Sequence, residues 1–451
     1  MKMQDDRNLS SFKSTFVFGT ATAAFQIEGA ANEDGRVDSI WDRFCAEPNN
    51  IVNGDDGLVA CDHYHLWEKD LQKLKDLGVD AYRFSMAWTR IITSTEKEIS
   101  QTGLDFYQQI IDRLHFYQIK PFVTLYHWDL PQYLQEQGGW LNRDTAYQFA
   151  KYADVVSSHF GNQIHTYTTF NEPWCSAMLG YLHGIHAPGI KDRKQALQVA
   201  HIILLAHGLA MPLLRRNAPM AQHGIVLNMG PYDAASLSEQ DQLAAELAES
   251  ENNDWFIQPL LEGCYPALIQ EIYPDELPDI ESGDMDIISA PNDYLGINYY
   301  TRQVICHNPS NVTFTYDSVT PEEAEVTAMG WEVYPAGLTQ LLVNLNKRYE
   351  MPPVYITENG MASDDDYDEV LVNDNQRVKY LREHLYAVAD AIEAGVDVRG
   401  YFAWSLLDNF EWSEGYSKRF GLYYVDYVTQ ERVPKLSAHF YKDFIRRARS
   451  R

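Results

Sequence analysis

The sequence predicts a protein of the α/β class in which eight parallel strands alternate with helices. Short apolar, β-rich runs recur eight times along the 451 residues, and amphipathic stretches separate them. The runs are continuously apolar rather than alternating, which is typical of parallel strands buried on both faces. Eight strand–helix units favour a closed (β/α)8 barrel, the TIM barrel, over a doubly wound open sheet. The runs cover residues 16–21, 81–86, 121–127, 165–171, 224–228, 293–298, 354–358 and 399–405.

The helices between these runs show apolar residues spaced three and four apart. Leu66, Leu71, Leu74 and Leu77 lie mostly on one helical face before Gly78, a residue type that commonly ends helices. A long helix is predicted from Asn375 to Ala394. Long loops follow the first, sixth and seventh strands, and the acidic stretch 364–369 is expected to be solvated surface. One catalytic barrel domain is expected over residues 1–451, with its core at about 12–445.

Composition excludes several classes of protein. The net charge is -28, so the chain lacks the basic surface that nucleic-acid binding needs. Its five cysteines are scattered without a CxxC pair, so neither a disulfide framework nor a zinc site is expected. No apolar segment near Met1 resembles a signal peptide, and no run approaches 18 apolar residues. We therefore expect a cytoplasmic protein with no nucleic-acid or membrane partner.

Polar residues stand at the carboxyl ends of the predicted strands, where the functional residues of barrels collect. Two of these endings are glutamates, Glu172 on the fourth strand and Glu358 on the seventh. These strands are nearly opposite in an eight-stranded ring, so the two carboxyls would face each other across its mouth. The remaining polar or aromatic endings are Gln26, Glu28, Arg83, Ser85, His127, Trp128, Asp129, Asn171, Asn228, Asn298, Tyr300, Trp404 and Ser405.

A facing pair of carboxyls is what hydrolysis of a glycosidic bond requires, one protonated and one ionised. A separation of about 5–5.5 Å gives retention of configuration and about 6.5–9.5 Å gives inversion. A lone glutamate at such a position could instead cap a helix or pair with an arginine. Apolar neighbours such as Trp174 favour an acid role for Glu172, whereas Arg83 and Tyr300 could hold Glu358 ionised as the nucleophile.

Four motifs in this order carry a family resemblance. They are Phe-Val-Phe-Gly-Thr-Ala-Thr-Ala-Ala-Phe-Gln-Ile-Glu-Gly at 16–29, Thr-Phe-Asn-Glu-Pro at 169–173, Ile-Thr-Glu-Asn-Gly at 356–360 and Trp-Ser-Leu-Leu-Asp-Asn-Phe-Glu-Trp at 404–412. Through them nearly the whole chain resembles glycoside hydrolase family 1, the β-glucosidase family. The resemblance implies a retaining hydrolase without metal or organic cofactor, with Glu358 as nucleophile and Glu172 as acid/base.

The resemblance also implies a substrate and the residues that bind it. The small-molecule partner would be a β-glycoside, its terminal non-reducing β-D-glucosyl residue being released by double displacement from cellobiose, short cello-oligosaccharides or aryl β-glucosides. A homo-oligomer is left open. By the resemblance, Gln26, His127, Asn171, Glu411 and Trp412 bind sugar hydroxyls, Trp404 forms the floor under the ring, Trp128 lines the pocket, Arg83, Asn298 and Tyr300 hold the nucleophile, and Trp331 stacks on the aglycone.

The resemblance leaves more than one activity open. A 6-phospho-β-glucosidase is disfavoured because relatives acting on phosphorylated sugars usually have serine where this chain has Glu411, a carboxylate that would repel phosphate. Lys418, nearby in sequence, occurs in both types. A broad β-galactosidase or β-fucosidase activity stays open, as does endo-acting hydrolysis of a polysaccharide. A non-catalytic sugar-binding barrel is disfavoured because both Glu172 and Glu358 are retained.

Overall fold

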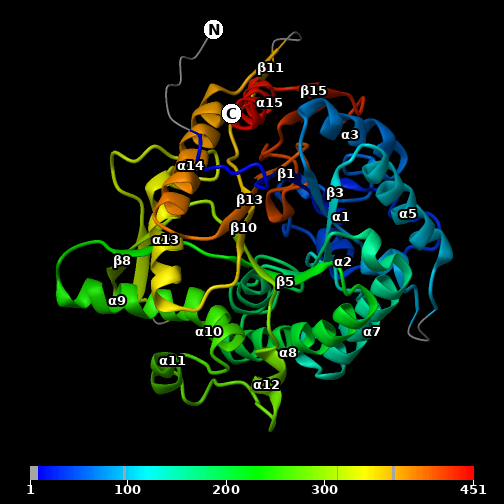
Figure 1. The fold of residues 1–451 in the computed structure, drawn as a ribbon. Helices are drawn as coiled ribbons and strands as arrows, with labels where there is room; N and C mark the ends of the chain where they lie inside the picture. Colours follow the sequence, from blue (N-terminus) through cyan, green and yellow to red (C-terminus); the bar gives the residue numbers. More distant parts are fainter. Residues whose placement is uncertain (1–8, 95–97, 312, 368–370, 451) are drawn as a thin grey trace.

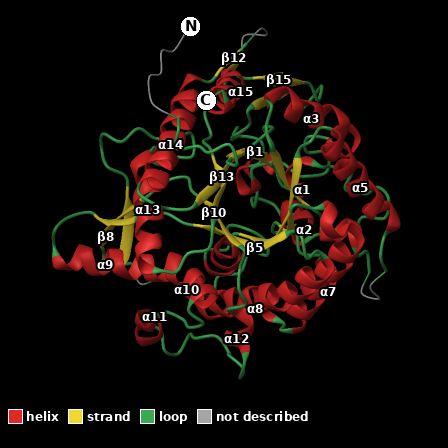
Figure 2. Cartoon of the chain, viewed as in Figure 1, coloured by secondary structure: helices red, strands yellow, loops and turns green. Residues whose placement is uncertain are grey.

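A computed structural model describes residues 9–94, 98–311, 313–367 and 371–450. The N-terminal residues 1–8, on which the expectation of no signal peptide partly depends, lie outside the described residues. Among the described residues, the chain forms a central barrel of strands within a ring of helices (Figures 1 and 2). The C-terminus lies beside α15 on the outside of the barrel.

Eight parallel strands close the barrel in the order β1-β13-β10-β7-β5-β4-β3-β2. The predicted (β/α)8 TIM barrel is therefore confirmed, and each predicted strand begins and ends within two residues of an observed one. Continuous burial explains the agreement, because β1, β2, β4, β7 and β10 are buried at every position. The strands are β1 Val17–Ala21, β2 Ala81–Ser85, β3 Lys120–Tyr126, β4 Thr166–Asn171, β5 Gln222–Asn228, β7 Tyr294–Asn298, β10 Val354–Asn359 and β13 Val398–Trp404.

The helices pack their apolar faces on this barrel. In α3, Leu71, Leu74 and Leu77 are buried as predicted, and Gly78 ends the helix with a φ of 73°. The helices are α1 Ala24–Ile27, α2 Ile40–Ala46, α3 His63–Leu77, α4 Trp88–Ile91, α5 Gln101–Phe116, α6 Gln132–Gln135, α7 Asp144–Phe160, α8 Arg193–Asn217, α9 Glu239–Glu249, α10 Trp255–Leu261, α11 Ala267–Ile272, α12 Asp284–Ile288, α13 Pro335–Arg348, α14 Asn375–Glu393 and α15 Leu436–Arg449.

The long loops carry their own small elements. Strand β6 (Tyr232–Ala234) joins β8 (Gln303–His307) and β9 (Tyr316–Val319) in a three-stranded sheet beside α9 (Figure 1). Two-stranded pairs form between β11 (Asp366–Tyr367) and β12 (Val372–Asn373), and between β14 (Tyr423–Val425) and β15 (Arg432–Pro434). Short 3-10 or π-helical turns are η1 Val52–Gly54, η2 Gly139–Leu141, η3 Gly161–Gln163, η4 Cys175–Leu182, η5 Ser250–Asp254 and η6 Trp412–Glu414.

The acidic stretch 364–369 is not solvated throughout, which corrects the expectation. The Asp365 side chain is buried and pairs with Arg377 at 3.0 Å and with Lys435. These two buried cations compensate the carboxylate and so make its burial tolerable. Asp364 is exposed, and residues 368–369 lie outside the described part.

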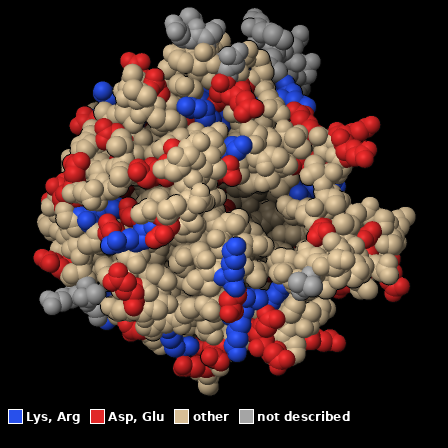
Figure 3. All heavy atoms as spheres, turned by 180° about the vertical axis from the view of Figure 1, so that it is seen from behind, with Lys and Arg blue, Asp and Glu red and all other residues tan. Residues whose placement is uncertain are grey.

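Acidic side chains are spread over the face shown in Figure 3, with lysines and arginines in smaller groups. All five cysteines are free thiols. In the described ranges, His, Cys, Asp and Glu nowhere gather in threes that could hold a metal ion. Helix α8 is long and apolar enough to cross a membrane, but 78% of its apolar window is buried inside the fold, where it packs on α7 and α12.

Candidate active site

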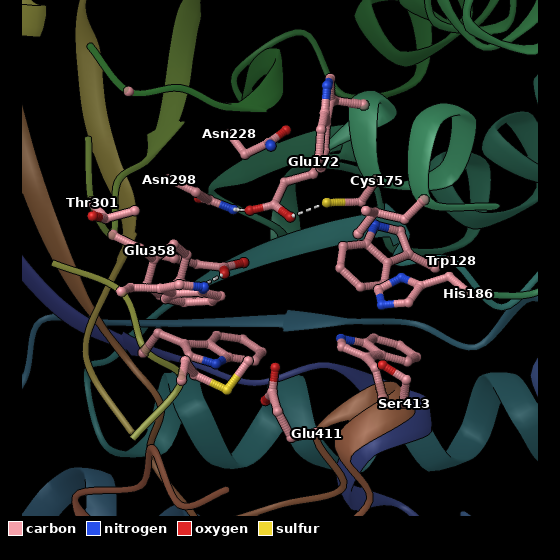
Figure 4. A pocket seen from close by; sticks show the side chains of 18 of the residues that line it. Trp128, Glu172, Cys175, His186, Asn228, Asn298, Thr301, Glu358, Glu411 and Ser413 are labelled. Atoms are coloured by element: carbon pink, nitrogen blue, oxygen red, sulfur yellow. Dashed lines mark hydrogen bonds between the residues drawn. The ribbon is translucent and has the colours of Figure 1, made fainter. Parts of the chain in front are cut away.

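A cavity of about 440 Å³ opens at the carboxyl ends of the barrel strands. Of the thirteen residues that the sequence nominated, all but Arg83, Asn171 and Gln26 line it, and these three lie buried directly behind the lining. Figure 4 shows Glu172 and Glu411 reaching into the cavity from opposite sides, with Glu358 at a third side. The nominated lining residues are His127, Trp128, Glu172, Asn298, Tyr300, Trp331, Glu358, Trp404, Glu411 and Trp412.

Glu358 is held by a cation and a phenol at the end of β10. Arg83 Nη1 donates to its Oε1 at 2.5 Å, and the Tyr300 hydroxyl donates to its Oε2 at 2.6 Å. Both contacts were expected from the sequence. Gly360 lets the chain leave β10 close to β13, because a Cβ there would lie 1.8 Å from the carbonyl oxygen of Trp404. Charge-assisted hydrogen bonds of this kind are stronger than neutral ones, so Arg83 and Tyr300 fix the position of the Glu358 carboxyl.

Glu172 has a different set of partners at the end of β4. The Asn298 amide donates to its Oε1 at 2.6 Å, and the Cys175 thiol lies 3.0 Å from its Oε2. Burial, followed by the negative charge of Glu358, raises the pKa of Glu172 to about 7. A carboxyl in this state holds a proton near neutral pH, which suits a general acid.

The partner of Asn298 corrects one expectation from the resemblance. Asn298 was expected to hold Glu358, yet its amide donates to Glu172 and, at 3.0 Å, to Asn171 Oδ1. The physical reason is its acceptor side: the Thr357 hydroxyl donates to Asn298 Oδ1 at 2.7 Å, which turns the NH₂ group toward β4. Asn298 thus belongs to the surroundings of Glu172.

Asn171 is the centre of a buried polar network. Its Oδ1 accepts from Arg83 Nη2 at 2.7 Å and from Asn298, so its Nδ2 is the donor toward His127 Nε2 at 3.0 Å. Burial, and then the charge of Arg83, hold the pKa of His127 well below its usual value. A neutral His127 that accepts at Nε2 carries its proton on Nδ1, and this atom has no partner among the described residues. His127 therefore offers a free donor at the cavity wall.

The aromatic side of the cavity combines flat rings with strained backbone. The His127 ring stacks on Trp404 and on Trp412, each at a centroid distance of 5.9 Å. Trp128, Glu172 and Trp412 have φ values of 79°, 47° and 51°, a left-handed conformation that costs an ordinary residue about 1–2 kcal/mol. Strain of this kind persists where the surroundings over-determine it and is concentrated at functional sites. Flat apolar faces of this size match the C–H face of a sugar ring.

Glu411 supplies a polar group on the opposite side of the cavity from Glu172, and Gln26 lies buried behind it, with its Nε2 3.5 Å from Glu411 Oε2. Gln26 Nε2 donates to Asn409 Oδ1 at 3.0 Å and to the Phe410 carbonyl at 2.8 Å, and in the described structure its Oε1 has no partner. Burial, with the charges of Glu358 and Glu172, raises the pKa of Glu411 to about 8. The Lys418 ammonium donates to the carbonyl of Ala328 at 2.8 Å.

Several lining residues had no place in the sequence-based site. His186 packs against Trp41 and Trp128, and Asn228, noted from sequence only as a strand ending, lines the cavity. Cys175 also lines the cavity and was not among the site residues predicted from the sequence. It stands three residues after Glu172 at the start of η4, and the i, i+3 spacing on a helical turn is the signal that could have found it.

Comparison with known proteins agrees with this geometry. The family model described as "Glycosyl hydrolase family 1" matches residues 8–450. The chain is 45% identical to a β-glucosidase of Agrobacterium sp. over 442 residues, which is 97% of this chain and 96% of the relative. It is 46% identical to a bifunctional β-D-glucosidase/β-D-fucosidase of Bifidobacterium breve, over 96% and 98% of the two chains.

Solved structures give the same result. The fold superposes on the family 1 β-glucosidase of Thermotoga maritima with a TM-score of 0.95 at 43% identity, covering 98% of this chain and 99% of that one. The identity extends over nearly the full length of both the relatives and this chain. The chain therefore belongs to glycosyl hydrolase family 1.

Proposed function

We propose that this family 1 β-glucosidase releases terminal β-D-glucosyl residues with retention of configuration, with Glu358 as nucleophile and Glu172 as acid/base. One observation carries the proposal: two carboxyls face one cavity, one beside a guanidinium and a phenol and the other beside an amide and a thiol. Such unlike surroundings separate the protonation states of the two groups, as a double displacement requires.

In the first step a Glu358 oxygen forms a bond to the anomeric carbon while the bond from that carbon to the aglycone oxygen breaks. The proton of Glu172 passes to the departing oxygen, so the aglycone leaves as a neutral alcohol. Arg83 and Tyr300 keep Glu358 in position for the attack. Asn171, whose remaining amide hydrogen is available, and the Nδ1 of His127 are positioned to donate to sugar hydroxyls.

In the second step Glu172 acts as a base. The charge of Glu358 is one cause of the raised pKa of Glu172, and an ester at Glu358 carries no charge. The pKa of Glu172 therefore falls once the glycosyl-enzyme forms. Ionised Glu172 takes a proton from water, the water oxygen bonds to the anomeric carbon, and Glu358 leaves as a carboxylate. Two inversions restore the starting configuration.

The substrate that we propose is an unphosphorylated β-glucoside, namely cellobiose, a short cello-oligosaccharide or an aryl β-glucoside. Glu411 lines the cavity with a carboxyl, whereas Lys418 is engaged by a backbone carbonyl and is not among the lining residues. A phosphate would therefore meet an acid rather than a cation. The bifunctional relative supports a second candidate, an additional β-fucosidase activity. D-Fucose is galactose without the 6-hydroxyl, so comparing turnover of the β-fucoside with that of the β-galactoside tests how strongly the 6-hydroxyl is bound.

The test of the mechanism is NMR of the first-formed anomer together with azide rescue of two variants. Retention should give β-glucose first. In Glu358→Gly, azide should occupy the vacated space and give α-glucosyl azide; in Glu172→Gln, azide needs no general base and should give β-glucosyl azide from a glucoside with a good leaving group. α-Glucose as the first product, or the reverse pairing of azide products, contradicts the assignment.

The test of the substrate is a panel of nitrophenyl β-glucoside, its 6-phosphate, the β-fucoside, the β-galactoside and cellobiose. We expect the glucoside to have a higher kcat/KM than its 6-phosphate by at least about a hundredfold, because a phosphate beside the buried Glu411 would lose its hydration without gaining a cationic partner. A preference for the 6-phosphate would reject the unphosphorylated substrate. Equal rates for fucoside and glucoside would support the second candidate.

A further inference from the structure

Cys175 is a cavity-lining residue that contacts one of the two facing glutamates. Its Sγ lies 3.0 Å from Glu172 Oε2, and its side chain is almost fully buried, with 6% exposed. The contact is built into the local chain, because the backbone N–H of Cys175 donates to the Glu172 carbonyl at 3.0 Å as η4 begins. Figure 4 shows the thiol and the Asn298 amide on opposite sides of the Glu172 carboxyl.

The two oxygens of Glu172 have different partners. An amide NH₂ can only donate, so Oε1 is an acceptor for Asn298 at 2.6 Å. The proton of the acid form therefore resides on Oε2, the oxygen that faces Cys175. A thiol is both a weak donor and a weak acceptor. It can accept from the protonated carboxyl and donate to the ionised one.

We propose that Cys175 is a positioning residue for the acid/base carboxyl, its thiol holding Glu172 Oε2 in both protonation states and favouring the ionised one. The inference rests on the acid/base role proposed for Glu172. The preference follows from charge, because a hydrogen bond to an ionised carboxylate is stronger than one to a neutral carboxyl. Cys175 would thus help Glu172 to act as a base in the second step.

The thiol can keep this role across the working pH range. Burial, and then the Glu172 charge, raise the pKa of Cys175 well above its ordinary value, so its S–H is retained. The same state makes it a poor nucleophile toward thiol reagents, since the thiolate is the reactive form. The charged or titratable groups besides Cys175 that act on Glu172 are Glu358 from β10, Arg83 from β2, and Tyr300 and Glu411 from the loops after β7 and β13.

The test compares Cys175→Val, which keeps the approximate shape without a donor, with Cys175→Ser, which keeps a donor. The readout is the alkaline limb of kcat/KM for an aryl β-glucoside, which reports the protonated acid in the free enzyme. Without the thiol, the pKa of Glu172 should rise, moving this limb upward by about 0.3 to 1 pH unit. Cys175→Ser should return the limb to the wild-type pH or below it.

Cys306→Ala is the matched control, because the Cys306 thiol also contacts an oxygen, the Asp317 carbonyl at 3.6 Å, but in the sheet formed by β8 and β9. Its limb should stay in place. An unmoved limb in Cys175→Val, or equal shifts in the Val and Ser variants, would overturn the inference. If Cys175→Val does not fold, Cys175→Ala against Cys175→Ser decides in the same way.

Failure of this inference is distinguishable from failure of the proposed function. If azide rescues Glu172→Gln with the β product but the Cys175 variants keep the wild-type limb, Glu172 is the acid/base and only the thiol role is wrong. If azide does not rescue Glu172→Gln, the acid/base role itself fails and the positioning role of Cys175 is overturned with it.

Discussion

The ends of β4 and β10 present the same side chain to one cavity in opposite chemical settings. At the end of β10, the Glu358 carboxyl accepts hydrogen bonds from the Arg83 guanidinium and the Tyr300 hydroxyl. At β4, Glu172 receives an amide and faces a thiol, and the charge of Glu358 adds to the effect of burial. The strands β5 and β7 separate the two positions in the ring.

The two glutamates therefore differ in the charge of their hydrogen-bond donors, which is cationic at Glu358 and neutral at Glu172. A cationic donor compensates a buried carboxylate, whereas neutral donors leave desolvation to dominate. Asn171 and Asn298 link the two ends, because Arg83 and Asn298 both donate to Asn171 Oδ1. Changes at β10 should therefore act on the rate of attack, and changes at β4 on the pH profile.

The largest expected effect is at the cation. Arg83→Met leaves Glu358 buried without its ion-pair partner, a loss of about 3–5 kcal/mol, so kcat/KM should fall by two to four orders of magnitude. Arg83→Lys keeps the charge, but its ammonium cannot donate to Glu358 and Asn171 together as the guanidinium does. Its kcat/KM should therefore lie between those of the wild type and of Arg83→Met. Steady-state kinetics with an aryl glucoside, alongside urea unfolding, measures both. If kcat/KM of Arg83→Met stays within tenfold of the wild-type value, the cation is not what distinguishes Glu358 from Glu172.

The pH profile has the next largest effect. Glu172 must carry a proton in the first step, and its pKa is about 7 in the free enzyme. As pH rises through this value the acid is lost, so the fall in kcat/KM should approach about tenfold per unit and reach about fiftyfold between pH 7 and pH 9. Because Glu411 and Glu358 interact electrostatically with Glu172, the apparent pKa in the pH profile belongs to the three carboxyls together. A dinitrophenyl glucoside should show a shallower fall in kcat/KM, because its phenol needs little protonation to leave. If kcat/KM for the nitrophenyl glucoside stays constant up to pH 9, Glu172 is not the acid.

Tyr300 tests the second donor on Glu358. Tyr300→Phe removes one hydrogen bond to a charged group, about 1.5–3 kcal/mol, so kcat should fall roughly 10- to 100-fold. Tyr355→Phe is a matched control on β10, where the hydroxyl donates to Gln222 at the opposite end of the barrel. It should change unfolding more than turnover. Equal losses of kcat in the two variants would show a general effect on packing instead.

The barrel itself was predictable because strands buried on both faces appear in the sequence as continuous runs of apolar residues. Strand β5 shows where this pattern fails. It begins at Gln222, two residues before the predicted start, because Gln222 and His223 are polar. Strands β8 and β9 escaped prediction because they are partly exposed and built into a loop, so they lack a continuous apolar run. Their pairing depends on tertiary placement rather than on apolar pattern.

For the site, strand-end position was enough to nominate Glu172 and Glu358 and to expect Arg83 and Tyr300 near the latter. Strand-end position did not predict which glutamate Asn298 contacts, because residue spacing does not give the orientation of an amide. The hydrogen bond from the Thr357 hydroxyl to Asn298 Oδ1 fixes that orientation. Asp365 was misjudged for a related reason: its cations are Arg377 on the next helix, α14, and Lys435, which is 70 residues away in sequence. Sequence patterns therefore do not predict the direction in which a side chain points or which charged residues pair across long distances in the chain.

Substitution of Asn298 should have the smallest effect on turnover, and it tests directly which of the two glutamates this amide serves. Asn298→Ala removes the donor from Glu172 Oε1, and since this hydrogen bond lowers the pKa of Glu172, the pKa should rise by about one unit. The alkaline limb of kcat/KM should move up accordingly, while kcat on the plateau should change less than in Tyr300→Phe. Asn228→Ala is the control: this asparagine also lines the cavity, and its Oδ1 has no partner among the described residues. Its alkaline limb should not move. If Asn298→Ala lowers kcat as much as Tyr300→Phe and leaves the limb in place, the amide serves Glu358 after all, and the division of the cavity into two ends fails.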